Sequence, residues 1–140
     1  MIPNTDDALR MLSQRLMTQL LPDLRSTYSL SDGALIGLLM NAIADETAEG
    51  INRRLEDLKE MRQIFDSATS LLNDEQKADI ANTVESYRLA DVNKLHDAYT
   101  RVLIDVHGRC ESNENLQTLN NQIWAYLQRH AERHTIRGMP

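Results

Sequence analysis

The sequence predicts an all-α protein, specifically an up-and-down antiparallel bundle of about four helices with a long second helix. Apolar residues recur every three or four positions along most of the chain, and no alternating run typical of a strand occurs. Leu, Ala and Met are plentiful, whereas Phe65, Trp124 and four tyrosines are the only aromatic residues. This composition favours helices over sheets. Short polar connections between the periodic segments favour antiparallel neighbours in a single domain over residues 1–140.

The first helix is expected to begin at Asn4 or Thr5, whose side chains suit an N-cap. Its apolar residues at helical spacing are Leu9, Leu12, Leu16 and Leu20. Pro22 lacks a backbone N–H and disfavours helical geometry at the residue before it, so the helix should end or kink there.

The second helix is predicted over residues 31–72, with Ser31 as its cap. It begins apolar on every side and ends amphipathic, and the polar and small residues 45–50 separate the two halves. Some 40 helical residues span about 60 Å, whereas a compact globule of this length is about 35–40 Å across. The helix therefore either breaks near Gly50 or extends into an apolar end that a partner subunit covers. Gly33 and Gly37, one turn apart, would let another helix approach closely.

The third helix is predicted from Asn73 to about Gly108, with Gln76 completing a capping box. Gly108 is a natural stop. The fourth helix is predicted to begin after Ser112 or Asn113 and to fray from about Ile136.

Composition excludes several classes of function. The net charge of −6 argues against general nucleic-acid binding, which needs a concentrated basic surface. No apolar run approaches the roughly 20 residues that cross a bilayer, and the N-terminus lacks a signal-peptide pattern. Cys110 is the only cysteine, so no internal disulfide forms, and a cytoplasmic location is expected. We interpret Cys110 as an unreactive thiol near a helix end.

A polar layer inside the bundle is one candidate site. Residues equally far from an antiparallel turn lie level, which places His96 near His130 and Tyr99 near Tyr126. The candidate ligand-binding residues are Glu46, Glu49, Arg53, His96, Tyr99 and Tyr126. Di-metal bundles require Glu-x-x-His motifs, and the chain has none. The simpler interpretation turns the acids outward, with Glu49 paired to Arg53 and residues 53–60 forming a solvated face of alternating charge.

His130 and His134 are candidate metal ligands. Histidines at i and i+4 share one helix face and can reach one divalent transition-metal ion. Two imidazoles are half a site, so a third ligand would come from Glu46, Glu49 or His96. The alternative is a basic last turn, favoured by the negative end of the helix dipole.

No catalytic pattern stands out, so the sequence favours a protein that is not an enzyme and holds no cofactor. It is expected to act through self-association, with a dimer favoured, or through contact with another protein. The candidate interface residues are Leu35, Leu38, Leu39, Met40 and Trp124. A bundle that binds a metal or small ligand through carboxylates and histidines is the alternative.

Overall fold

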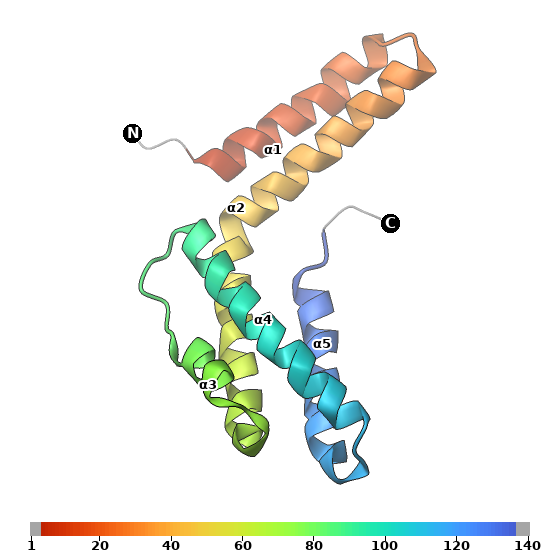
Figure 1. Ribbon diagram of the computed structural model, residues 1–140. Coiled ribbons are helices and arrows are strands. Elements are labelled where there is room, and N and C mark those ends of the chain that lie inside the picture. The colour runs from red at the N-terminus through yellow and green to blue at the C-terminus, as the bar shows by residue number, and fades with distance from the viewer. Residues whose placement is uncertain (1–3, 137–140) are drawn as a thin grey trace. The chain divides into compact units, whose positions relative to one another are not determined.

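The computed structural model describes residues 4–136, and within that range it is helical throughout its regular structure, with no strand (Figure 1). The α-helices are α1 (Thr5–Arg15), α2 (Thr27–Ser67), α3 (Asp74–Ala81), α4 (Leu89–Glu111) and α5 (Gln117–Arg133). Short helical turns η1 (Leu16–Leu20), η2 (Leu21–Asp23), η3 (Thr69–Leu71) and η4 (Glu114–Leu116) join them. The all-α prediction is confirmed, whereas the α-helices number five and not about four.

The described residues form two compact units. Unit 1 comprises residues 4–50 with Ile136, and unit 2 comprises Ile51–Thr135. The prediction of one domain over residues 1–140 stays a prediction. Within the described range no helix is long and apolar enough to cross a membrane.

Helix α2 runs through Gly50 without interruption for 41 residues, so of the two alternatives the break near Gly50 is absent. One glycine costs only about 1 kcal/mol relative to alanine inside a helix. The backbone at Gly50 is buried, and a Cβ there would lie 2.6 Å from the Glu46 carboxylate carbon. The helix also begins four residues before Ser31 and ends five residues before Leu72.

The predicted third helix is split into α3 and α4 by residues 82–88. The capping box forms as expected: Asn73 accepts from the Gln76 backbone, and Gln76 accepts from the Asn73 backbone. Asn82 then adopts an extended conformation that ends α3. The Tyr99 hydroxyl lies 2.8 Å from the Ile80 carbonyl and 3.0 Å from the Asn82 carbonyl. It can therefore donate a hydrogen bond to the carbonyl oxygens that the end of α3 leaves without a helical partner.

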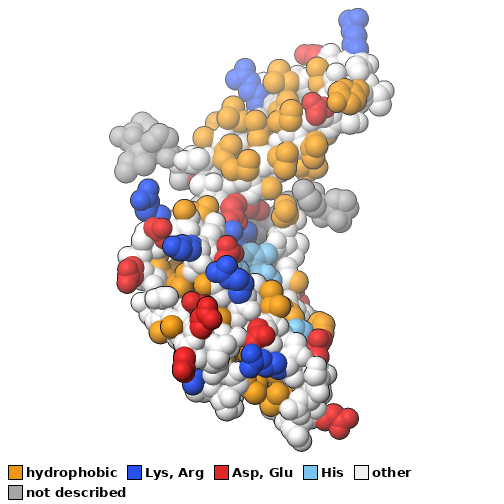
Figure 2. Space-filling view, viewed as in Figure 1, with side chains coloured by type: hydrophobic (Ala, Val, Ile, Leu, Met, Phe, Trp, Pro, Cys, Tyr) orange, Lys and Arg blue, Asp and Glu red, His pale blue; other side chains and the backbone are white. Residues whose placement is uncertain are grey.

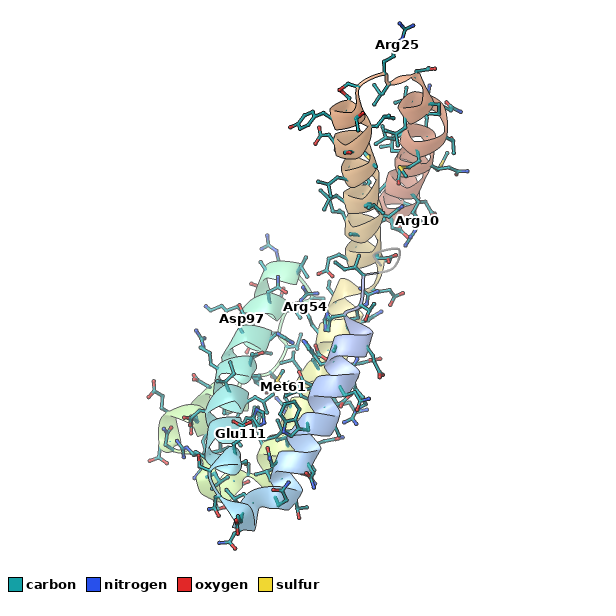
Figure 3. The ribbon with its side chains drawn as sticks, turned by 90° about the vertical axis from the view of Figure 1, so that its right-hand side faces the viewer. Arg10, Arg25, Arg54, Met61, Asp97 and Glu111 are labelled. Atoms are coloured by element: carbon teal, nitrogen blue, oxygen red, sulfur yellow. The ribbon has the colours of Figure 1, made fainter. Side chains whose placement is uncertain are left out.

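Unit 2 has a continuous apolar core between the second half of α2, α4 and α5 (Figure 1). Its buried side chains are Leu58, Met61, Ile64, Phe65, Ala68, Leu72, Tyr99, Val102, Leu103, Val106, Cys110, Leu119, Ile123 and Tyr126. Met61, labelled in Figure 3, lies among these helices. The Phe65 and Tyr99 rings meet edge to face with centroids 5.6 Å apart, a favoured aromatic geometry.

Unit 1 is a helical hairpin in which α1 and η1 lie against the first half of α2 (Figure 1). The contact runs over Gly33 and Gly37: the Ser13 hydroxyl donates to the Gly37 carbonyl at 2.9 Å, and a Cβ on Gly37 would lie 2.8 Å from the Met17 sulfur. The Arg10 guanidinium donates to Asp45 at 2.6 Å near the hairpin's open end. The glycines therefore let side chains of the first helical segment, among them Leu21 and Met17, pack directly onto the backbone of α2.

The core of unit 2 yields a stability prediction. Ile123 is fully buried, so Ile123→Ala should lower the free energy of unfolding by about 2–5 kcal/mol through lost contacts and a residual cavity. Ile104 on α4 is 67% exposed, and Ile104→Ala should change the free energy of unfolding by less than about 0.5 kcal/mol. Urea denaturation followed by circular dichroism measures both, and equal losses would contradict the core described above.

Candidate functional site

A buried carboxylate lies at the centre of the candidate site. Asp57 on α2 has no exposed surface. It lies one turn before Met61 and two turns before Ile64, on the same helix face as these core side chains. An ionised carboxylate removed from water is costly unless it is paired and hydrogen-bonded, so its surroundings must supply partners.

Three imidazoles supply most of that pairing, all at one oxygen of Asp57. Its Oδ2 lies 2.6 Å from His134 Nε2, 2.9 Å from His130 Nδ1 and 3.1 Å from His96 Nε2. His130 in α5 and His134, which directly follows the end of that helix, have ring centroids 4.4 Å apart, and His96 comes from α4. The His96 ring stacks near His130 at 6.0 Å. Side chains from three helices thus converge on a single atom.

Arg133 binds the other side of the carboxylate. Its guanidinium donates to Asp57 Oδ1 through Nη1, to Glu60 through Nη2 and to Glu56 through Nε, the last at 2.9 Å. Arg129 adds a further contact to Glu60 at 2.7 Å. Five charged side chains of α2 and α5 therefore form a network around the histidines.

The electrostatics follow from this packing. Burial alone would raise the pKa of Asp57, but the hydrogen bonds from His96 and His134, the charge of His130 and the hydrogen bond from Arg133 outweigh it. The net effect holds the pKa of Asp57 well below its ordinary value, so the carboxylate is ionised. The pKa of Tyr126, whose hydroxyl lies 3.4 Å from His130 Nδ1, is raised by burial and by the nearby Asp57 charge.

Three of these groups have the geometry of metal ligands. Ligand atoms of Asp57, His130 and His134 all lie within 4.8 Å of one another. Zinc–nitrogen and zinc–oxygen bonds of about 2.0–2.1 Å place tetrahedral ligand atoms about 3.3 Å apart. The present contacts to Oδ2 are 2.6 and 2.9 Å, so these nitrogens would move away from Oδ2 by about 0.7 and 0.4 Å to reach the tetrahedral spacing.

A small cavity adjoins the site between α4 and α5. Its volume is about 120 Å³. Its lining is His96, Thr100, Leu103, Ile104, His107, Ile123, Tyr126, Leu127 and His130. Two histidines of the cluster therefore border a space large enough for a few water molecules or a very small ligand.

The residues that the sequence placed in one polar layer are divided between the two units. His96, His130 and Tyr126 lie together in unit 2, whereas Glu46 and Glu49 belong to unit 1. Tyr99 is buried and its hydroxyl contacts the end of α3, while Arg53 is half-buried on α2.

The candidate interface residues also fall into two groups. Leu35 and Leu39 are exposed in unit 1, and Leu38 and Met40 beside them are half-buried. Trp124 lies in unit 2, is 53% exposed, and meets His107 edge to face at 5.3 Å.

Sequence reasoning missed the two central residues, Asp57 and Arg133. Residues 53–60 were interpreted as a solvated face, and this is wrong for Asp57, which is fully buried. The signal was available: extending the apolar face of Met61 and Ile64 back by one turn reaches Asp57. An acid on a core-facing position requires buried cationic or hydrogen-bonding partners, and α5 carries four such side chains in its last two turns.

Comparisons with protein-family models, with curated proteins and with solved structures found no match for this chain. The site must therefore be interpreted from its own geometry.

The buried carboxylate generates a stability prediction. Asp57→Asn keeps the shape but removes the charge that pairs Arg133 and the imidazoles, so unfolding should become easier by about 3 kcal/mol or more. Asp97→Asn changes an exposed aspartate of α4 (Figure 3) and should cost less than about 0.5 kcal/mol. Chemical denaturation in the presence of a chelator measures both. A loss no larger than that of the control would show that the network does not hold the helices together.

Cys110 offers a test of reactivity. It is 2% exposed, and burial raises the pKa of its thiol, so less thiolate is present at a given pH. Iodoacetamide should therefore alkylate the folded protein at mildly alkaline pH much more slowly than protein unfolded in urea. Equal rates in the two states would contradict the buried placement.

Proposed function

We propose that this protein binds one divalent transition-metal ion through Asp57, His130 and His134, with His96 beside them. The observation that carries the proposal is the convergence of imidazole nitrogens from two helices on one oxygen of a buried carboxylate. Such an oxygen has two lone pairs, so three imidazole donors exceed what it accepts well. An ion between these atoms would be coordinated by a lone pair of the Asp57 oxygen and by one lone pair from each imidazole.

The donor set indicates the class of metal. Imidazole with one carboxylate suits Zn²⁺, Ni²⁺ or Cu²⁺, whereas Mg²⁺ and Ca²⁺ prefer oxygen ligands. His96 Nε2, at 3.1 Å from the same oxygen, is the candidate for a fourth ligand. Arg133 would act on the ion indirectly, because it holds the other oxygen of Asp57 in place.

Charge balance supports a cation at this point. Glu56, Asp57 and Glu60 carry three negative charges, and Arg129 and Arg133 carry two positive ones. Metal binding requires neutral imidazoles, and in that form the network carries one net negative charge. A bound dication would offset that charge and would link α2 to α5. A network of ion pairs that never binds metal is the competing interpretation.

The metal site does not by itself imply catalysis, and we propose none. Association with other chains and a cytoplasmic location remain predictions from the sequence; the exposed apolar side chains of unit 1 and the single, buried Cys110 support them.

Titration of metal-free protein with Zn²⁺, Ni²⁺ and Cu²⁺ tests the proposal. Isothermal calorimetry and native mass spectrometry should find one ion per chain. His130→Ala and His134→Ala should each weaken binding by more than the roughly 10–100-fold typical of a lost outer-shell partner. A ligand concentration about 100 times the dissociation constant should stabilise the wild type by about 2.7 kcal/mol.

His107→Ala is the matched control, because His107 lies on α4 and lines the same cavity as His96 and His130. Its ring lies beside Trp124, away from Asp57, so affinity should be unchanged. If the wild type takes up no ion, or if His107→Ala weakens binding as much as His130→Ala, the proposed site is wrong.

A further inference from the structure

An apolar stripe runs along the outer side of α2 in unit 1. Leu35, Ile36, Leu39 and Ile43 are 49%, 43%, 45% and 54% exposed. At 100° per residue they fall within one sector about 100° wide. Gly33 and Gly37 point roughly the other way, toward α1. The stripe is therefore the face of α2 that its own hairpin leaves uncovered.

Unit 1 has little else to hold it together. Among its described residues, Leu21 and Ala44 have the only buried apolar side chains. Met11, Leu12, Met17 and Leu20 of α1 and η1 are also exposed, and Figure 2 shows hydrophobic side chains gathered over this hairpin. Most of the stability of a helix in a protein comes from packing its apolar face. A hairpin that exposes this many apolar side chains is therefore expected to pack against another surface.

The spacing within the stripe indicates what kind of surface would cover it. Ile36, Leu39 and Ile43 are separated by three and then four residues, the pattern of a seam between packed helices. Asp32 and Glu46 occupy the next seam positions at either end, so the apolar seam is short and bounded by acids. The complementary surface is thus a helix with its own short apolar seam.

We propose that the occupant is a second copy of this hairpin, so that two chains pair through unit 1. A twofold interface places each patch against itself. Residues 33–44 contain no charged side chain, so the apolar centre of the stripe can lie against its own copy without charge repulsion. Like charges meet only at the two ends of an antiparallel pair, where Asp32 of one copy comes level with Glu46 of the other.

The exposed area sets how such a pair must form. A standard interface buries roughly 800 Å² per partner, and the four stripe residues expose about half of that area. Whole hairpins would therefore pair, with exposed side chains of α1 and η1 supplying the rest. Four helices would then share one core.

A lipid surface fits this hairpin less well. Residues 4–50 carry seven acidic and three basic side chains. Helices that lie on anionic membranes have a basic polar face, which this segment lacks. Vesicles of anionic lipid should therefore not bind the protein, and binding that abolishes dimers would overturn the proposal.

Sedimentation equilibrium over a range of concentrations tests the pairing, with a chelator present so that the result is independent of the metal site. The wild type should approach twice the chain mass. Leu39→Asp should raise the dissociation constant at least tenfold. Ile104→Asp introduces the same charge on an exposed face of α4 in unit 2 and should leave the dissociation constant unchanged. A wild-type monomer, or equal effects of the two changes, would overturn the proposal.

Two further measurements guard against a variant that merely unfolds. Leu39→Ser, a milder change, should also weaken pairing while unit 2 keeps its helical signal. Raising the salt from about 0.05 M to about 0.5 M should not weaken the wild-type dimer, because screening removes attraction only from charged contacts. Dissociation at high salt would indicate a different, charge-based interface.

Discussion

The buried carboxylate of Asp57 is the interaction on which the rest of unit 2 depends. An ionised acid with no exposed surface is tolerated only because α4 and α5 bring imidazole and guanidinium groups to it. The same requirement fixes the register of α5 against α2, since a shift of one turn would carry His130, Arg133 and His134 past the carboxylate. Apolar packing alone is less selective, because many hydrophobic arrangements of similar volume are acceptable.

The two units rely on different physics. Unit 2 combines a continuous apolar core with a polar network. Unit 1 relies on side chains such as Leu21 and Met17 that pack onto Gly33 and Gly37, and it leaves most of its larger apolar side chains exposed. A single helix, α2, contributes to both. Its first half is apolar and nearly uncharged and its second half is amphipathic, which matches these two environments.

Much of the secondary structure could be predicted from the sequence, because capping and periodicity are local. The cap at Asn73, the stop near Pro22 and the helical class follow from neighbouring residues. The break at residues 82–88 is accompanied by contacts of the Tyr99 hydroxyl with carbonyls 17 and 19 positions away, which a local pattern does not show. The turn register placed His96 beside His130. The core-facing position of Asp57 could have been read from Met61 and Ile64, but which side chains pair with it could not, since His130 and Arg133 are more than 70 residues distant.

That separation has a consequence during synthesis. Asp57 is joined to His130 and His134 across 73 and 77 residues of chain. At about 5–20 residues per second, the ribosome makes this stretch in roughly 4–15 s. Throughout that interval the carboxylate has none of its α5 partners, so the second half of α2 cannot settle into its final burial. A nascent chain that stalls before α5 would keep this helix face hydrated and recognisable to chaperones or proteases as unfinished.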